Sequence, residues 1–310
     1  MPNSISIVIP THNRSACLRK TLDSLKEQSF SDFEVIVSDD GSTDDTESVV
    51  KQNLWPFPVL YFGHKKKGSS FSRNFGVKQG SAPLILFLDD HVFLDPDCLG
   101  SHYLFHQELA GTAYQIVRCR AFHLKECEKV PPVKILKPVT FREKLDEQNP
   151  WVTFFTCNTS LRKEAFEKVG GFDEKFTEYG FEDNELGYRL SRAGYKFKIN
   201  PEAVGYIFSP PVDFSEQLGK ARQVGHMAVV FARKYPSRKF LVGVHFFNYL
   251  VYQIFAFFPG ILKRLEAGYR EAEFRQDSGK KDFYEFWLKH YNFLAGIEEA
   301  KEKTWKSQLS

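Results

Sequence analysis

Two nearby stretches decide the fold of this chain: ISIVIPTHNR at residues 5–14 and FEVIVSDDGST at residues 33–43. Each begins with a short apolar run that predicts a buried strand, and each ends in polar residues where the strand stops. Between them, Leu18, Leu22 and Leu25 recur at the spacing of one helix face. The order strand, helix, strand, with short connections, predicts a parallel α/β sheet with helices on both faces.

The same alternation continues to residue 91. Val59 to Phe62 predicts a short strand, a helix is expected from Ser69 or Ser70 to Gly80, and LILFLDDH at residues 84–91 predicts a strand that runs directly into polar residues. In an open parallel sheet, ligands bind beyond the carboxyl ends of the strands. Three polar clusters are therefore expected on one rim of the sheet: residues 10–14, 39–40 and 89–91.

The second half of the chain is less regular. Residues 125–150, rich in Lys, Glu and Pro, predict a loop. We expect a strand at 151–158, a helix from Glu182 to Ala193, a strand through Tyr195 and Ile199, and mainly helices from Phe214 onward. The expected division is a nucleotide-binding part at 1–100, an acceptor-binding and catalytic part of the same domain at 101–212, and a helical extension at 213–310.

Composition excludes some classes of protein. The 310 residues are 42% apolar and 26% charged, and the net charge of +3 is too small to indicate nucleic acid as the main partner. Five cysteines without a C-x-x-C pair suit neither a zinc knuckle nor a disulfide framework. The N-terminus lacks the pattern of a signal peptide, so we expect a cytoplasmic protein.

The predicted rim has no glycine-rich phosphate loop, so a phosphate ligand there would need a cation. Asp89 and His91 are two residues apart and, in an extended segment, would point to the same side and hold a divalent ion. Imidazole favours Mn²⁺ over Mg²⁺. The alternative is a polar loop that ends a buried strand. Asp39 and Asp40 are likewise either turn residues or acceptors for a base or ribose hydroxyl.

Glu182 and Asp183 open a predicted helix. Carboxylates at a helix N-terminus are favoured by the macrodipole whatever their function. A carboxylate there can also act as a general base that deprotonates an acceptor hydroxyl. The residues alone leave both interpretations open.

Six segments, taken together, resemble the family 2 glycosyltransferases, whose nucleotide-sugar fold is called GT-A. They occur in the order of that family between Ser4 and Tyr206, at residues 6–14, 35–44, 72–76, 88–92, 170–174 and 180–190. The resemblance implies a metal-dependent, inverting enzyme. It would transfer a sugar from a nucleotide diphosphate sugar, with UDP as the expected carrier, to a glycan or lipid-linked acceptor in glycan or polysaccharide biosynthesis.

The resemblance also implies roles for single residues. Asp89 and His91 fall on the two acidic positions of the D-x-D metal motif, Asp183 matches the catalytic base, and Glu182 would shape the acceptor site. Many relatives place a further metal-binding histidine after a segment like residues 201–204, where this chain has none; His226 is the next histidine downstream. The donor would be held by Pro10, Thr11, Arg14, Asp40, Arg73, Asp89 and Asp90, with Thr11, Arg14 and Asp40 at the nucleoside and Arg73 near the base or diphosphate.

Two other classes remain open on this sequence. A nucleotidyltransferase can share the nucleotide rim and the need for a metal, and a glycan-binding or scaffold module can keep the fold without its chemistry. The missing histidine favours the second of these, whereas Glu182 and Asp183 favour transfer to a sugar acceptor.

The segment from Phe240 to Leu262 contains no Asp, Glu, Lys or Arg. As one helix it would be about 35 Å long, enough to cross a bilayer core. A polar stripe that includes His245, Asn248 and Gln253, and basic residues on both flanks, argue against a span. We expect instead a helix that lies on the inner, anionic membrane face or packs on the catalytic domain.

Overall fold

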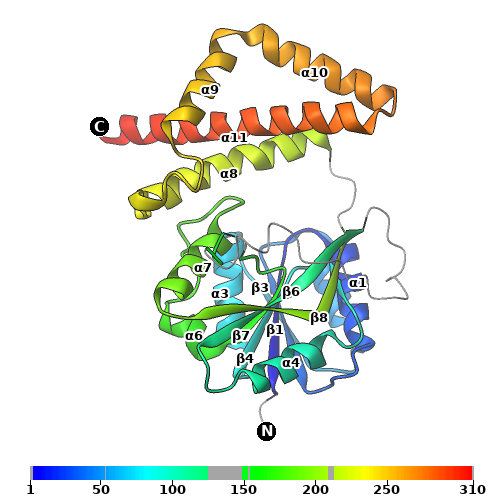
Figure 1. The fold of residues 1–310 in the computed structure, drawn as a ribbon. Helices are drawn as coiled ribbons and strands as arrows, with labels where there is room; N and C mark the ends of the chain where they lie inside the picture. Colours follow the sequence, from blue (N-terminus) through cyan, green and yellow to red (C-terminus); the bar gives the residue numbers. More distant parts are fainter. Residues whose placement is uncertain (1–2, 53, 125–148, 153, 209–212, 309–310) are drawn as a thin grey trace. The chain divides into compact units, whose positions relative to one another are not determined.

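The computed structural model describes residues 3–52, 54–124, 149–152, 154–208 and 213–308 (Figure 1). The chain forms two compact units. The first comprises Met1–Thr177 and Glu182–Pro210, and the second comprises Glu178–Phe181 and Pro211–Ser310. The predicted loop at 125–150 lies almost wholly outside the described residues.

The first unit is built on one mixed sheet, in which the described strands run in the order β3-β2-β1-β4-β7-β6-β8-β5. The first four strands of this order are parallel to one another, as the sequence predicts, and β7 joins β4 antiparallel. The bounds are β1 Ile5–Thr11, β2 Phe33–Asp39, β3 Val59–Gly63, β4 Leu84–Leu88, β5 Val92–Leu94, β6 Tyr114–Leu124, β7 Asn158–Arg162 and β8 Lys196–Phe208.

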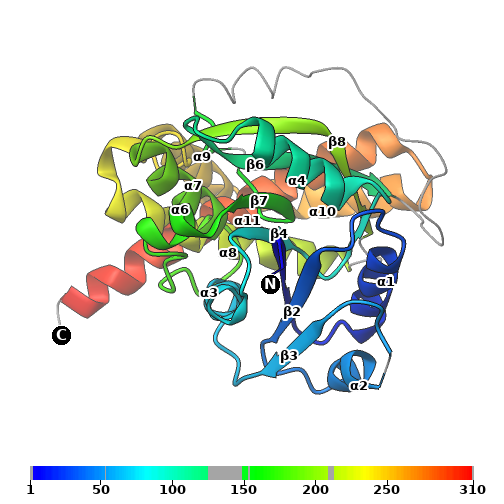
Figure 2. The ribbon, with the colours of Figure 1, turned by 90° about the horizontal axis from the view of Figure 1, so that it is seen from below.

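Helices cover both faces of the parallel part of the sheet (Figure 2). Helix α1 (Ser15–Lys26) buries Leu18 and Leu22 in one core with Ile7, whereas Val8, whose side chain points to the other face, packs with Val77 of α3 (Ser69–Gln79). The remaining described helices of the unit are α2 Thr46–Lys51, α4 Cys98–Glu108, α6 Lys163–Lys168 and α7 Glu182–Arg192. The α/β fold class predicted from the sequence is thereby confirmed.

The strand predicted at 151–158 is wrong. Residues 150–152 form a turn, and strand β7 begins only at Asn158. Trp151 packs edge-on against Tyr188 of α7, and Phe154 is buried in the core that α7 covers. These apolar residues are buried against a helix, so the local sequence carries strand-like composition without a strand.

The second unit is mainly helical in its described residues, as predicted for the C-terminal extension. Its helices are α8 Phe214–Lys234, α9 Phe246–Phe257, α10 Pro259–Phe274 and α11 Ser278–Gln308, with a short 3₁₀ turn at Pro236–Arg238. Helices α8 and α11 approach closely at two glycines. A Cβ on Gly225 would lie 2.1 Å from the carbonyl oxygen of Phe293, and one on Gly296 would lie 2.1 Å from that of Arg222.

A single helix over 240–262 is also wrong. Helix α9 begins at Phe246, where the His245 side chain accepts a hydrogen bond from Asn248 N, and α9 ends before Pro259. Proline lacks the N–H that a continuous helix needs there, but it suits the first turn of α10. None of the described helices is both long and apolar enough to cross a bilayer.

Candidate active site

The polar clusters that follow β1, β2 and β4 lie at one edge of the sheet. Thr11, the last residue of β1, is the register partner of Asp39, the last residue of β2, and Pro10 is the partner of Ser38. On the other side of β1, the Thr11 hydroxyl donates a 2.8 Å hydrogen bond to Asp90, which follows β4. The parallel strands thus bring segments about 80 residues apart into direct contact at the predicted rim.

Asp90 is hydrogen-bonded to several other residues at this rim. Its buried carboxylate accepts from Thr11 and, at 3.2 Å, from Arg14 Nη1, and its backbone oxygen accepts from the Thr21 hydroxyl at 2.9 Å. The Nδ1 atom of His91 lies 3.2 Å from Asp90 Oδ1 and 3.3 Å from Arg14 Nη1. The middle residue of the D-x-H sequence is therefore buried and held by protein groups, while its two neighbours are partly exposed.

The segment of Asp89, Asp90 and His91 is a turn, closed by a 3.1 Å hydrogen bond from Val92 N to Asp89 O. The expectation of an extended segment, which put Asp89 and His91 on one side, is therefore wrong. Both side chains remain partly exposed, Asp89 at 24% and His91 at 21%. Among the described residues, no group of three or more His, Cys, Asp or Glu side chains could hold a metal ion.

Arg73 joins the end of β4 to the start of α7. Its buried guanidinium lies 3.1 Å from Asp89, 3.5 Å from Glu182 and 3.9 Å from Asp183. Burial disfavours the charged form, but the three carboxylates outweigh it and raise the pKa of Arg73. The Arg73 cation therefore lies within 4 Å of Asp89, which follows β4, and of the two carboxylates at the start of α7.

Asp183 is held in place by Thr156, a residue for which the sequence gave no signal. The backbone N–H of Thr156 donates to Asp183 Oδ2 at 3.0 Å, and its hydroxyl donates to Oδ1 at 2.7 Å. Burial raises the pKa of Asp183, while the Arg73 charge and the Thr156 hydrogen bonds act in the opposite direction. The net effect is a carboxyl group that binds a proton more tightly than an ordinary aspartate.

The two aspartates after β2 are engaged by neighbouring loops. Asp40 accepts from Lys67 N at 2.6 Å and from Gly68 N at 2.9 Å, and Gly68 adopts a positive φ of 94° that favours glycine. Asp39 accepts from Ser42 N at 2.8 Å and from the Tyr61 hydroxyl at 2.6 Å. Sequence reasoning missed Tyr61, which the end of β3 brings beside the rim.

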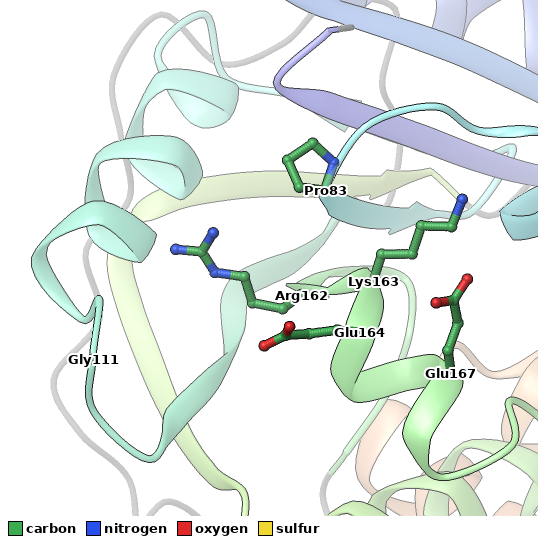
Figure 3. Close-up of a pocket in the computed structure, with 6 residues that line it drawn as sticks. All are labelled: Pro83, Gly111, Arg162, Lys163, Glu164 and Glu167. Atoms are coloured by element: carbon green, nitrogen blue, oxygen red, sulfur yellow. The ribbon is translucent and has the colours of Figure 1, made fainter.

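His226, in the second unit, has both ring nitrogens against carboxylates, with Nδ1 2.8 Å from Glu178 and Nε2 3.1 Å from Glu299. A hollow of about 480 Å³ lies at the opposite end of β4, next to Pro83, which precedes that strand (Figure 3). It is lined by Pro83, Gly111, Arg162, Lys163, Glu164 and Glu167.

The sequence profile of the family described as glycosyl transferase family 2 matches residues 6–170, more than half of the chain and most of the sheet described above. This chain belongs to glycosyl transferase family 2. A second profile, described as the N-terminal domain of galactosyltransferase, matches residues 136–211. The two matches together span the end of β4 and the start of α7, the two segments that Arg73 connects.

Characterised members of the family align over about two thirds of this chain. The validoxylamine A glucosyltransferase of Streptomyces hygroscopicus subsp. jinggangensis (strain 5008) is 35% identical over 229 residues, 65% of this chain and 54% of that enzyme. The chondroitin synthase of Escherichia coli is 28% identical over 241 residues, 67% of this chain and 35% of that enzyme. The chain spans about half the length of the validoxylamine glucosyltransferases that it matches.

Solved structures agree with the GT-A fold of this family member. The mannosyltransferase PcManGT of Pyrobaculum calidifontis, in complex with GDP-Man and Mn²⁺, superposes with a TM-score of 0.63 at 16% identity, covering 96% of this chain and 86% of the other. S. aureus TarS 1-349 in complex with UDP-GlcNAc gives 0.57 at 16% identity, covering 97% and 92%.

Proposed function

We propose that this chain transfers a sugar from a nucleotide diphosphate sugar, with UDP favoured, to a hydroxyl of a glycan or lipid-linked acceptor, with inversion at the anomeric carbon. One observation supports the proposal above the others: the Arg73 guanidinium lies 3.1 Å from Asp89, on the proposed donor side, and 3.9 Å from Asp183, on the proposed acceptor side. The names of the family relatives, a glucosyltransferase and a chondroitin synthase, support a role in glycan biosynthesis.

Asp183 is the proposed general base. A base works best when its pKa lies near the working pH, and burial raises the pKa of this carboxyl toward that range. Glu182, one residue earlier on the same helix turn, would shape the acceptor site. The acceptor hydroxyl would lose its proton to Asp183 as its oxygen attacks the anomeric carbon and the nucleoside diphosphate leaves.

On the donor side, we assign the nucleoside to the rim of Pro10, Thr11, Arg14 and Asp40. Arg14 is partly exposed and adjoins Asp90, so one side of its guanidinium can face a ligand. We place the donor part of the domain at 1–100, the acceptor part at 101–212 and the helical extension at 213–310.

Asp89 and His91 would hold a divalent cation together with the diphosphate of the donor. Both side chains are partly exposed and so open to a bound donor, which would have to supply the remaining ligands of the cation. Imidazole as a donor favours Mn²⁺ over Mg²⁺. Such an ion would neutralise the charge of the leaving diphosphate.

The cation site is tested by calorimetry of UDP binding with and without Mn²⁺. We expect Mn²⁺ to strengthen binding to the unaltered protein by roughly tenfold or more, and His91→Ala to remove most of that gain by taking away a ligand. Lys78→Ala, in the last turn of α3 and exposed, serves as the control that retains the gain. Identical affinities with and without Mn²⁺ would contradict the site.

The proposed base is tested by Asp183→Asn, which keeps the size of the side chain and removes its basicity. We expect transfer to fall by about 10²–10⁴-fold while UDP binding persists. Asp23→Asn, an exposed residue of α1 paired with Lys26, is the matched control and should retain full transfer. Unchanged turnover in Asp183→Asn would rule out the role, and release of pyrophosphate from a nucleoside triphosphate by the unaltered protein would indicate a nucleotidyltransferase.

A further inference from the structure

Helix α9 of the second unit exposes a continuous apolar surface. Five of its residues, spaced at i, i+1, i+4, i+8 and i+11, lie on one helix face, and all are exposed. Phe246 is 66%, Phe247 67% and Phe257 82% exposed. We call this surface the α9 outer face; it consists of Phe246, Phe247, Leu250, Ile254 and Phe257.

The opposite face of α9 is already used. Phe255 is buried, and its ring lies 5.5 Å from that of Tyr291 and 6.2 Å from that of Trp287, both on α11. Val251 and Tyr252 pack against the core that α8 and α11 share. One apolar face of α9 therefore packs in the core of the second unit. The α9 outer face is a second apolar face, and it stays exposed. Contiguous exposed apolar side chains of this kind are typical of interaction surfaces.

The segments that flank α9 in sequence are basic. From Gln217 to Leu265 the chain contains no Asp or Glu, whereas cations precede and follow α9. These cations are Arg233, Lys234, Arg238 and Lys239 before the helix and Lys263 and Arg264 after it. A second copy of the chain, docked symmetrically on this face, would bring two such basic sets together and be repelled. An anionic lipid surface complements both the apolar face and its basic flanks.

We propose that the α9 outer face inserts into the headgroup region of an anionic lipid bilayer, with the flanking lysines and arginines on the lipid phosphates. Phe and Leu are side chains that an amphipathic helix buries at the boundary between headgroups and acyl chains. Exposed Phe240, Leu241 and Phe258, next to α9 in sequence, extend the apolar surface. The inference goes beyond the proposed transfer reaction and does not depend on it.

Sedimentation of the full chain with lipid vesicles tests the proposal. We expect binding to vesicles of phosphatidylcholine mixed with phosphatidylglycerol, little binding to phosphatidylcholine alone, and weaker binding as salt is raised. The double variant Phe246→Ser/Phe257→Ser should lower the partition coefficient by roughly tenfold or more, because two large apolar side chains no longer enter the lipid. Lys239→Gln/Arg264→Gln should weaken binding only to the anionic vesicles.

The matched control is Phe274→Ser, at the far end of α10 and 89% exposed, which should bind as the unaltered chain does. Circular dichroism melting of each variant verifies that the exposed substitutions leave the fold intact. Equal binding by the Phe246→Ser/Phe257→Ser variant and the unaltered chain would overturn the proposal. It would also be overturned by a concentration-dependent dimer that the same double variant abolishes, since the face would then join two copies.

Discussion

At the scale of single residues, the site depends on contacts between segments far apart in the chain. Arg73 pairs with Asp89, sixteen residues away, and with Glu182, more than a hundred residues away. Arg73 is the shared counter-charge of these carboxylates, and its removal would leave Glu182 and Asp183 close together without it, which is costly at buried positions. The site is thus electrostatically preassembled, and its carboxylates need no ligand to hold them together.

Thr156 offers a test of this preassembly. Thr156→Val should remove the hydroxyl hydrogen bond to Asp183 and lower kcat/KM by roughly tenfold, since hydrogen bonds to charged groups contribute about 1.5–3 kcal/mol. That hydrogen bond lowers the pKa of Asp183, so its loss should move the acid limb of the pH–rate profile to higher pH. The measurement is kcat/KM of Thr156→Val and of the unaltered protein as a function of pH.

Thr156→Ser keeps the hydroxyl and should restore both the rate and the acid limb. A residue that served the fold alone would reduce the amount of active protein without moving the acid limb. That result in Thr156→Val would remove Thr156 from the role of positioning Asp183.

The sequence predicted part of this site and missed the rest for a physical reason. Asp89, Asp90 and the first turn of α7 were predictable because they follow or begin regular elements whose ends are marked by composition. The role of Arg73 between three carboxylates, and that of Thr156, depend on how α3, β4 and α7 meet in space. No local sequence pattern predicts contacts between elements so far apart in the chain. The turn at residues 89–91 was misjudged because alternation was assumed to continue past the end of β4.

At the scale of elements, the apolar pattern predicted the strands that are buried on both faces, which are continuous apolar runs, and the helices that bury one face. Strands β1, β2 and β4 and helices α1 and α7 all show a single dominant pattern, and all were predicted. The failures at Trp151 and at Phe258–Pro259 share a cause. In both places apolar residues are frequent, but their pattern does not decide the element. Trp151 packs against Tyr188 of α7 and its carbonyl accepts a 3.0 Å hydrogen bond from the Asn184 side chain, whereas Pro259 separates α9 from α10.

The crossing of α8 and α11 leads to a prediction at this scale. A methyl group on Gly225 would meet the backbone of α11, which cannot rotate away, so Gly225→Ala should destabilise the second unit by about 1–3 kcal/mol. Gly219→Ala, on the same helix with open space around its Cβ, should instead stabilise it by up to about 1 kcal/mol, because alanine favours helix.

Hydrogen exchange of peptides from α8 and α11 measures both effects. Faster exchange in Gly225→Ala and slower exchange in Gly219→Ala are expected. Equal exchange in the two variants would mean that the helices do not cross at this glycine.

At the scale of the whole molecule, the two proposals fall on different units. All residues assigned to transfer belong to the first unit, and the α9 outer face belongs to the second. A substitution on α9 should therefore change lipid binding without changing turnover of a water-soluble acceptor, and Asp183→Asn should do the reverse. The stability of the first unit depends on pH through two buried histidines, His102 and His106.

A chain of buried hydrogen bonds links α4 to β7. His106 Nε2 lies 2.9 Å from the Ser160 hydroxyl, which lies 2.8 Å from His102 Nδ1, and His102 Nε2 lies 3.1 Å from Asn158 Oδ1. All three contacts are satisfied when both imidazoles are neutral and carry their proton on Nε2. Burial lowers the pKa of His102 to about 4, and burial with the nearby His102 and Arg162 lowers that of His106 to about 3.

These shifts predict a loss of stability in mild acid. Between pH 6.5 and about pH 4, His102 is protonated in the unfolded chain but not in the folded chain. The free energy of unfolding therefore falls as the pH falls through this window. Each histidine adds a slope of up to about 1.4 kcal/mol per pH unit. His106→Gln should remove one such slope, and His102→Gln/His106→Gln should remove both. Hydrogen exchange of peptides covering α4 and β7, measured from pH 7 to 4 and corrected for intrinsic rates, reports the slopes. Parallel lines for the three proteins would show that folding does not lower the pKa of these histidines.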